Sequence, residues 1–163
     1  AAARPASQPG EIIPRPIHYV TDVQPILDKH CVSCHRPEKQ EGGLDLSGAL
    51  TTWFNRSYEE IMSKKLVAYI QEFHGPLERA QKTNVVPLPP KALGSHASRL
   101  VEIIRQGHYD TSLSAEEMAR LVTWADANAP YYGSYFGRRN LIYRGHSDFR
   151  PLPTLESACG EPP

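Results

Sequence analysis

Hydrophobic side chains recur every three or four residues in several parts of the chain, which is the pattern of amphipathic helices. The first such segment covers residues 21–35, with Thr21 or Asp22 as the expected N-cap and Pro25 in the first turn, where proline is tolerated. Its apolar face consists of Val23, Leu27, Cys31 and Cys34. Both cysteines are therefore expected to point in the same direction as the hydrophobic residues.

A second segment shows the same periodicity after residue 56. We expect a helix to begin near Ser57, which fits a capping box with Glu60, and to end at Gly75 and Pro76. Its apolar stripe would be Met62, Leu66, Tyr69, Ile70 and Phe73. No stretch of the chain shows the strict alternation of a half-buried strand, so the expected fold class is mainly α.

A pair of helices is predicted further along the chain, in "SRLVEIIRQG" and "LSAEEMARLVTWADANAP". Gly107 is the expected C-cap of the first, because glycine readily takes the left-handed conformation that ends many helices. Ser114 and Glu117 fit a capping box at the start of the second, and Pro130 marks its exit. Only the short loop "HYDTS" separates the two helices.

Charge and composition exclude two classes of protein. The 163 residues include 18 acidic and 18 basic side chains, so the chain lacks the basic surplus of a nucleic-acid-binding protein. No run of eighteen apolar residues is present, and no membrane span is expected. Residues 1–17 are rich in Ala and Pro, as in linkers between modules, and we expect residues 136–163 to pack on the domain and to end in a similar linker. A monomeric domain of a larger modular protein is therefore expected.

The motif "CVSCH", residues 31–35, carries the most specific chemistry in the sequence. Cys-x-x-Cys-His is the attachment signature of c-type haem, because the two thiols bind the porphyrin and the adjacent imidazole reaches the iron. A zinc site would need a fourth ligand, and Cys159 is the only other cysteine. A disulfide and a thioredoxin-like redox pair are the remaining alternatives, although no βαβ pattern accompanies the motif.

Three stretches of the chain resemble a known family of cytochrome c domains. They are "YVTDVQPILDKHCVSCH", "GGLDLSG" and "GSHASRLVEIIRQGHYDTSLSAEEMARLVTWADANAPYYGSY". They resemble domains in large secreted proteins of planctomycetes and of polysaccharide-degrading bacteria, and especially the C-terminal cytochrome domain of the hydrazine synthase alpha subunit. The resemblance implies a class I cytochrome c-like helical fold around one haem, in a mono-haem domain spanning residues 18–135. The fold would include a long central insertion, Gly42–Gly94, and an irregular C-terminal extension.

The resemblance also implies roles for particular residues. Cys31 and Cys34 would attach the haem covalently, and His35 would be the proximal iron ligand. In many small cytochromes a Met in the loop before the last helix is the second ligand, but here that loop contains His108. We therefore predict a six-coordinate His/His haem with His35 and His108 as the metal ligands. The alternative distal ligands are His146 and Met118, and an open distal site is a third alternative.

The function implied is the transfer of single electrons outside the cytoplasm, in the periplasm or the extracellular space. The partner would be a redox protein or a neighbouring domain, and some relatives suggest a secreted oxidative enzyme that acts on polysaccharide. Two protein ligands would leave the iron no position for a substrate, so such a domain would not be an enzyme. The alternative is a haem enzyme of peroxidase or hydrazine-synthase-like type with an open or weakly ligated distal site. A structural zinc or interaction module is the remote alternative.

Overall fold

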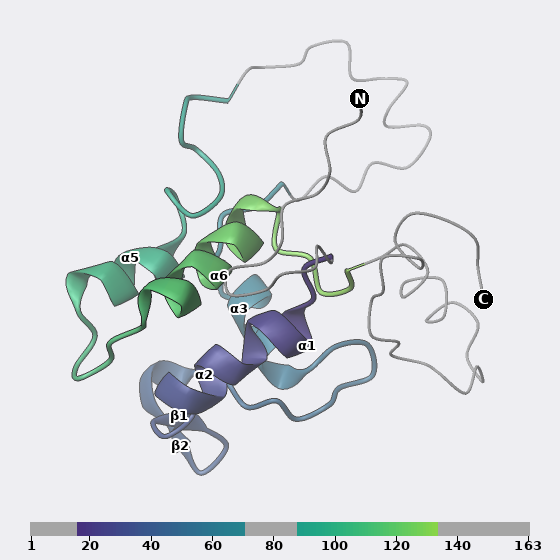
Figure 1. The fold of residues 1–163 in the computed structure, drawn as a ribbon. Helices are drawn as coiled ribbons and strands as arrows, with labels where there is room; N and C mark the ends of the chain where they lie inside the picture. Colours follow the sequence, from purple (N-terminus) through teal and green to yellow (C-terminus); the bar gives the residue numbers. More distant parts are fainter. Residues whose placement is uncertain (1–15, 71–87, 134–163) are drawn as a thin grey trace.

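The structure, a computed structural model, describes residues 16–70 and 88–133, and within these ranges the fold is mainly helical (Figure 1). The helices are α1 (Tyr19–Asp22), α2 (Gln24–His30), α3 (Arg56–Ser63), α5 (Arg99–Gln106) and α6 (Ala115–Asp126). A 3-10 helix, η1 (Glu41–Gly43), follows the antiparallel pair β1 (His35–Arg36) and β2 (Lys39–Gln40). The prediction of a mainly α fold is confirmed at this level. The predicted extension, residues 136–163, and most of the predicted linker lie outside the described residues.

The first predicted helix is two short helices with different ends. The chain enters α1 with His18 as the N-cap, so the prediction of Thr21 or Asp22 as the cap is wrong. Instead, the Asp22 carboxylate accepts a hydrogen bond of 2.6 Å from the His18 backbone N–H. Val23 separates α1 from α2, and Pro25 lies in the first turn of α2 as predicted, where its missing N–H costs no helical bond.

Helix α3 is shorter than the periodicity suggested. It begins after Asn55 and ends at Ser63, where Lys65 takes a left-handed φ of 53°. Leu66, Tyr69 and Ile70 therefore lie beyond the helix, and Phe73 lies outside the described residues. The predicted capping box of Ser57 and Glu60 is also wrong, because Ser57 is fully buried and bonds to side chains of other segments.

The two later helices begin and end close to the predicted positions. Gly107 is the C-cap of α5 with a φ of 86°. Ser114 and Glu117 form both bonds of the predicted capping box at the start of α6. Helix α6 ends at Asp126 instead of continuing to Pro130, because Asn128 and Ala129 both take left-handed φ values.

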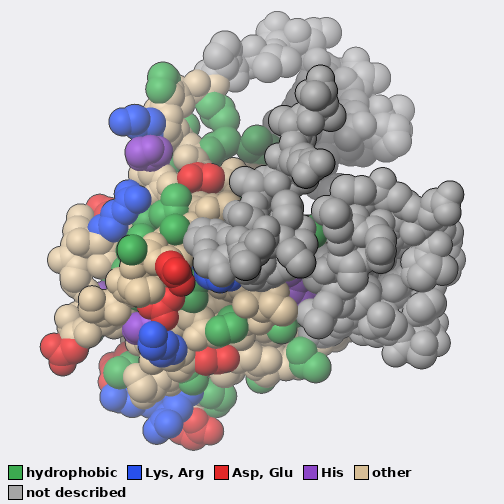
Figure 2. Space-filling model, viewed as in Figure 1, with side chains coloured by type: hydrophobic (Ala, Val, Ile, Leu, Met, Phe, Trp, Pro, Cys, Tyr) green, Lys and Arg blue, Asp and Glu red, His purple; other side chains and the backbone are tan. Residues whose placement is uncertain are grey.

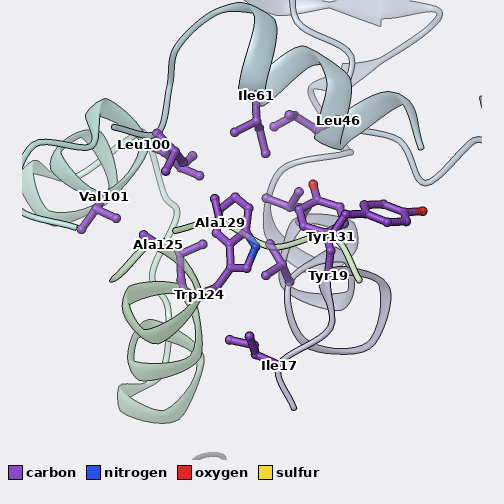
Figure 3. Packing of buried hydrophobic residues seen from close by; sticks show 14 residues of the cluster. Ile17, Tyr19, Leu46, Ile61, Leu100, Val101, Trp124, Ala125, Ala129 and Tyr131 are labelled. Carbon is purple, nitrogen blue, oxygen red and sulfur yellow. The ribbon is translucent and has the colours of Figure 1, made fainter. Parts of the chain in front are cut away.

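An aromatic cluster forms the centre of the core (Figure 3). Tyr19 of α1 stacks on Tyr131 with ring centres 5.6 Å apart, and its ring centre is 5.4 Å from that of Trp124 of α6. The Trp124 indole N–H donates to the Pro130 carbonyl at 2.9 Å. Together these contacts hold α1, α6 and the chain that follows α6 against one another.

Buried polar groups connect α1 and α2 to α3. The Tyr19 hydroxyl donates to the Ser57 hydroxyl at 2.9 Å, and Ser57 donates to the side-chain oxygen of Gln24. The Gln24 amide N–H₂ donates to the Leu46 carbonyl, and Asn55 donates to the same Gln24 oxygen. Because buried polar atoms are costly when they lack partners, this network favours one arrangement of the three helices.

The network predicts a specific cost for removing the Ser57 hydroxyl. We expect Ser57→Ala to lower the free energy of unfolding by about 1–3 kcal/mol, because the buried Tyr19 hydroxyl loses its acceptor. Tyr19→Phe should lower the free energy of unfolding less in the Ser57→Ala protein than in the wild type, because the bond between the two hydroxyls is already lost. The exposed Ser63→Ala on the same helix is the control, with an expected change below about 0.5 kcal/mol. Urea unfolding measures all five proteins, namely the wild type, the three single variants and the double variant, and equal effects of the two serine substitutions would contradict the assignment.

Candidate functional site

The motif Cys31–His35 forms a tight turn directly after α2. Helix α2 ends at His30, so the prediction of a continuous helix through residue 35 is wrong. The Leu27 carbonyl accepts from the N–H groups of both Cys31 and Val32, which closes the helix. The Cys31 carbonyl then accepts from Cys34 and His35 at 3.1 and 2.9 Å, and the chain continues into β1. One turn of backbone therefore fixes the two cysteines and the histidine relative to one another.

The two cysteines are free thiols with different surroundings. Cys31 is half-buried and packs against the core, whereas Cys34 is exposed, with the Lys39 Nζ atom 3.8 Å from its Sγ atom. Burial, and to a lesser extent the neighbouring Cys34, raises the pKa of the Cys31 thiol to about 11. Redox-active Cys-x-x-Cys pairs depend on a lowered thiol pKa, so this environment disfavours the thioredoxin-like alternative.

His35 is held at both its backbone and its ring. Its carbonyl accepts from the Leu46 N–H at 2.8 Å, and its Nδ1 atom lies 2.8 Å from the Glu41 carbonyl oxygen in η1. A carbonyl oxygen only accepts, so this bond requires the proton on Nδ1. The neutral ring then carries its lone pair on Nε2. A hydrogen bond of this kind orients metal-binding histidines and fixes their tautomer.

His108 lies on a tight turn between α5 and α6. The Thr111 N–H donates to the His108 carbonyl at 3.0 Å, and the residues on both sides of His108 have positive φ, 86° at Gly107 and 51° at Tyr109. The Tyr109 side chain is 94% exposed, and its ring stands edge-on to that of His108 at 4.9 Å. His108 itself is half-buried, so the turn directs histidine and tyrosine into different environments.

The fold brings the His35 and His108 rings together although they are far apart in the sequence. Their centres are 6.1 Å apart and their planes are within 16° of parallel. Two imidazoles that bind one metal ion from opposite sides have ring centres roughly 6 Å apart, since a metal–nitrogen bond is about 2 Å long and the ring centre lies about 1 Å beyond the nitrogen. The observed separation matches this value, and the near-parallel planes are equally those of two stacked rings.

Of the other candidate ligands, one belongs to a described helix and two lie outside the described residues. Met118 is a partly buried residue of α6, and His146 and Cys159 belong to the segment that the structure does not describe. Within residues 16–70 and 88–133, no three His, Cys, Asp or Glu side chains gather as a metal site would require. A haem iron needs only two axial ligands from the protein, so a pair of histidines is sufficient for it.

Glu117 joins the two segments that carry the histidines, and the sequence had indicated it only as part of a helix cap. Its Oε1 atom accepts from the Lys29 Nζ at 2.8 Å and lies 3.1 Å from the His30 Nε2, at the end of α2. Its Oε2 atom accepts from the Ser114 backbone N–H at 2.8 Å. No local pattern in the sequence relates α2 to α6, so this contact could not be found before the fold was known.

The surface around the motif carries charges of both signs. Figure 2 shows Lys and Arg intermixed with Asp and Glu at the lower end of the view, where Figure 1 places β1 and β2. The charged residues in and directly after this hairpin are Arg36, Glu38, Lys39 and, at the start of η1, Glu41, and all four are exposed. Such a surface has no single dominant sign. Within residues 16–70 and 88–133, no helix is both long enough and apolar enough to cross a membrane.

Comparison with known proteins adds no further assignment. No protein-family model matches the chain, and neither the curated proteins nor the solved structures contain a match.

The contacts of Glu117 predict how stability depends on pH. The hydrogen bond from Lys29, together with those from Ser114 and His30, lowers the pKa of Glu117 from 4.5 to about 2. In the unfolded chain the group would titrate near its ordinary value, so its stabilising contribution is complete above pH 4.5 and is lost as the pH falls toward 2. We expect the difference in unfolding free energy between wild type and Glu117→Gln to shrink over this interval, as measured by urea unfolding. A difference in unfolding free energy that does not change with pH would contradict the lowered pKa of Glu117.

Proposed function

We propose that this chain is a mono-haem c-type cytochrome module that transfers single electrons. Haem c would be attached covalently through Cys31 and Cys34, with His35 and His108 as the two iron ligands. The observation that carries the proposal is the 6.1 Å separation of the two imidazole rings directly beside a Cys-x-x-Cys-His turn. Chance pairs of histidines occur in many proteins, but here one member of the pair belongs to the attachment motif.

The free thiols suit covalent attachment. Each thiol would add across one vinyl group of the porphyrin, so that the sulfur bonds to one carbon and the thiol proton goes to the other. This addition needs two reduced cysteines on one turn, and Cys31 and Cys34 meet that need. A covalent bond at the exposed Cys34 and another at the half-buried Cys31 would hold the group partly inside the domain.

The histidines would determine what the bound iron does. Haem supplies an iron ion that changes between the ferric and ferrous states. The Glu41 carbonyl would make the His35 imidazole a more basic ligand, because it accepts the Nδ1 proton. His108 would be the second protein ligand and would exclude small substrates such as oxygen or peroxide. A His/His pair also favours the ferric state more than a His/Met pair does, which lowers the reduction potential.

The fold and the surface agree with this function but support it less specifically. Contact between α1 and α6, near the two ends of the described chain, is compatible with a class I cytochrome c-like arrangement. The mixed charges near the motif suit a partner that docks without strong electrostatic steering. We propose a redox protein or a neighbouring domain as the partner, in the periplasm or outside the cell. A secreted oxidative enzyme that acts on polysaccharide is one such partner.

Covalent haem can be tested directly. We expect the wild type, produced in a host with c-type cytochrome maturation, to retain haem on a denaturing gel at 18.2 kDa. Cys31→Ala combined with Cys34→Ala should lose the stained band, because no thioether can form. A colourless wild-type protein that contains zinc would overturn the proposal in favour of the structural-metal alternative.

The distal ligand has a separate test. We expect ferric wild type to be low-spin with a bis-histidine paramagnetic resonance signal, and the ferrous protein to bind carbon monoxide only slowly. His108→Ala should become high-spin and bind carbon monoxide, because one axial position opens. His96→Ala, at an exposed histidine that precedes α5, is the matched control and should behave as wild type. An unchanged spectrum in His108→Ala would show that another residue is the ligand.

A further inference from the structure

The Glu117 side chain bonds both to the end of α2, which precedes the His35 motif, and to the end of the loop that carries His108. Lys29 and His30 are the last residues of α2 and directly precede Cys31. Ser114 ends the loop that starts at Gly107 and carries His108. The two carboxylate oxygens divide these contacts, with Oε1 facing α2 and Oε2 facing the loop end.

The surroundings of the carboxylate make this contact firmer than an ordinary surface ion pair. The Glu117 side chain is 17% exposed and that of His30 is 13% exposed, although Lys29 is 63% exposed. Glu117 is also fixed from its own helix, since its backbone N–H donates to the Ser114 Oγ atom at 3.2 Å. A carboxylate that is held on several sides keeps one rotamer, so it can transmit the position of one segment to the other.

The backbone segments that connect the partners of Glu117 to the two histidines are closed into turns by hydrogen bonds. On one side, the turn that follows His30 is closed by the bonds from Cys34 and His35 to the Cys31 carbonyl. On the other side, the bond from Thr111 to His108 closes the turn that precedes Ser114. A change in the separation of α2 and the loop at Glu117 would therefore change the separation of the two rings.

From this arrangement we infer that Glu117 is a positioning residue that fixes the distance between His35 and His108, and so controls how readily His108 leaves the iron. The inference rests on the proposed function, because it takes the two histidines as the axial ligands. Glu117 touches neither ligand and acts through Lys29, His30 and Ser114. Its lowered pKa, about 2, keeps it ionised at every pH at which the protein is expected to work.

Three variants separate this role from that of a helix cap. Glu117→Gln preserves a capping-box acceptor for the Ser114 N–H but removes the charge that Lys29 and His30 bind. Lys29→Ala with His30→Ala removes the α2 side and leaves the capping box intact. Ser114→Ala removes the cap oxygen but leaves the contacts of Glu117 with α2. Glu116→Gln is the control, with the same change of charge on an exposed residue in the same helical turn.

The main measurement is the rate at which the ferrous holoprotein binds carbon monoxide, which enters only when the distal imidazole leaves. We expect the rate to rise roughly three- to tenfold in Glu117→Gln and in the Lys29/His30 variant, as expected for the loss of a charge-assisted contact. Glu116→Gln and Ser114→Ala should stay within about twofold of wild type, by the same scale. Hydrogen exchange at the Thr111 amide, which bonds to His108, should accelerate in the same two variants.

The outcomes distinguish this inference from the proposed function. If His108→Ala opens the haem but Glu117→Gln matches Glu116→Gln in both measurements, the positioning role is refuted and the proposed function stands. Equal effects of Ser114→Ala and Glu117→Gln would indicate that Glu117 acts only through the helix cap, and would also refute the positioning role. If His108→Ala changes nothing, the ligand assignment fails together with the control of the iron by Glu117.

Discussion

The packing of Tyr19 between Trp124 and Tyr131 is the interaction on which the rest of the described structure depends. This contact joins the first helix to the last one, and aromatic pairs of this kind add roughly 0.5–1.5 kcal/mol each beyond the burial of their surface. The buried Asp22 of α1 adds an ion pair of 3.3 Å to Arg120 of α6. Once α1 and α6 are held together, the end of α2 and the start of α6 meet, and the Cys31–His35 turn and the His108 loop lie on the same side of the molecule.

Sequence reasoning succeeded where the determinants are local. The capping box at Ser114 and the helix end at Gly107 depend on a few adjacent residues, and both appear where expected. Sequence reasoning failed where a residue that suits a local role forms a tertiary contact instead. Ser57 resembles a helix cap in the sequence, yet Tyr19 and Gln24 use its hydroxyl in the core. The end of α2 at His30 was likewise missed, because the shared Leu27 carbonyl and the pairing of β1 with β2 override the apolar periodicity.

The candidate site was likewise predictable only in part. Cys31, Cys34 and His35 follow from a specific motif, and His108 was selected because its loop holds no methionine. The structure adds what a sequence cannot show, which is the distance between the two rings and the tautomer of His35 set by the Glu41 carbonyl. The contacts of Glu117 with α2 could not be predicted for the same reason, because Lys29 and His30 are distant from it along the chain and share no pattern with it.

The bond between His35 and Glu41 also has a consequence for the order of folding. The proximal half of the site is built from contacts that are close in sequence, since the turn, the hairpin and η1 follow one another directly. The distal half needs α6 to pack on α1, which closes a long stretch of chain and therefore forms more slowly. A newly made chain would then form the Cys31–His35 turn before the His108 loop reaches it. Under the proposed function, this order would leave the two thiols accessible for haem attachment from the side that the His108 loop later covers.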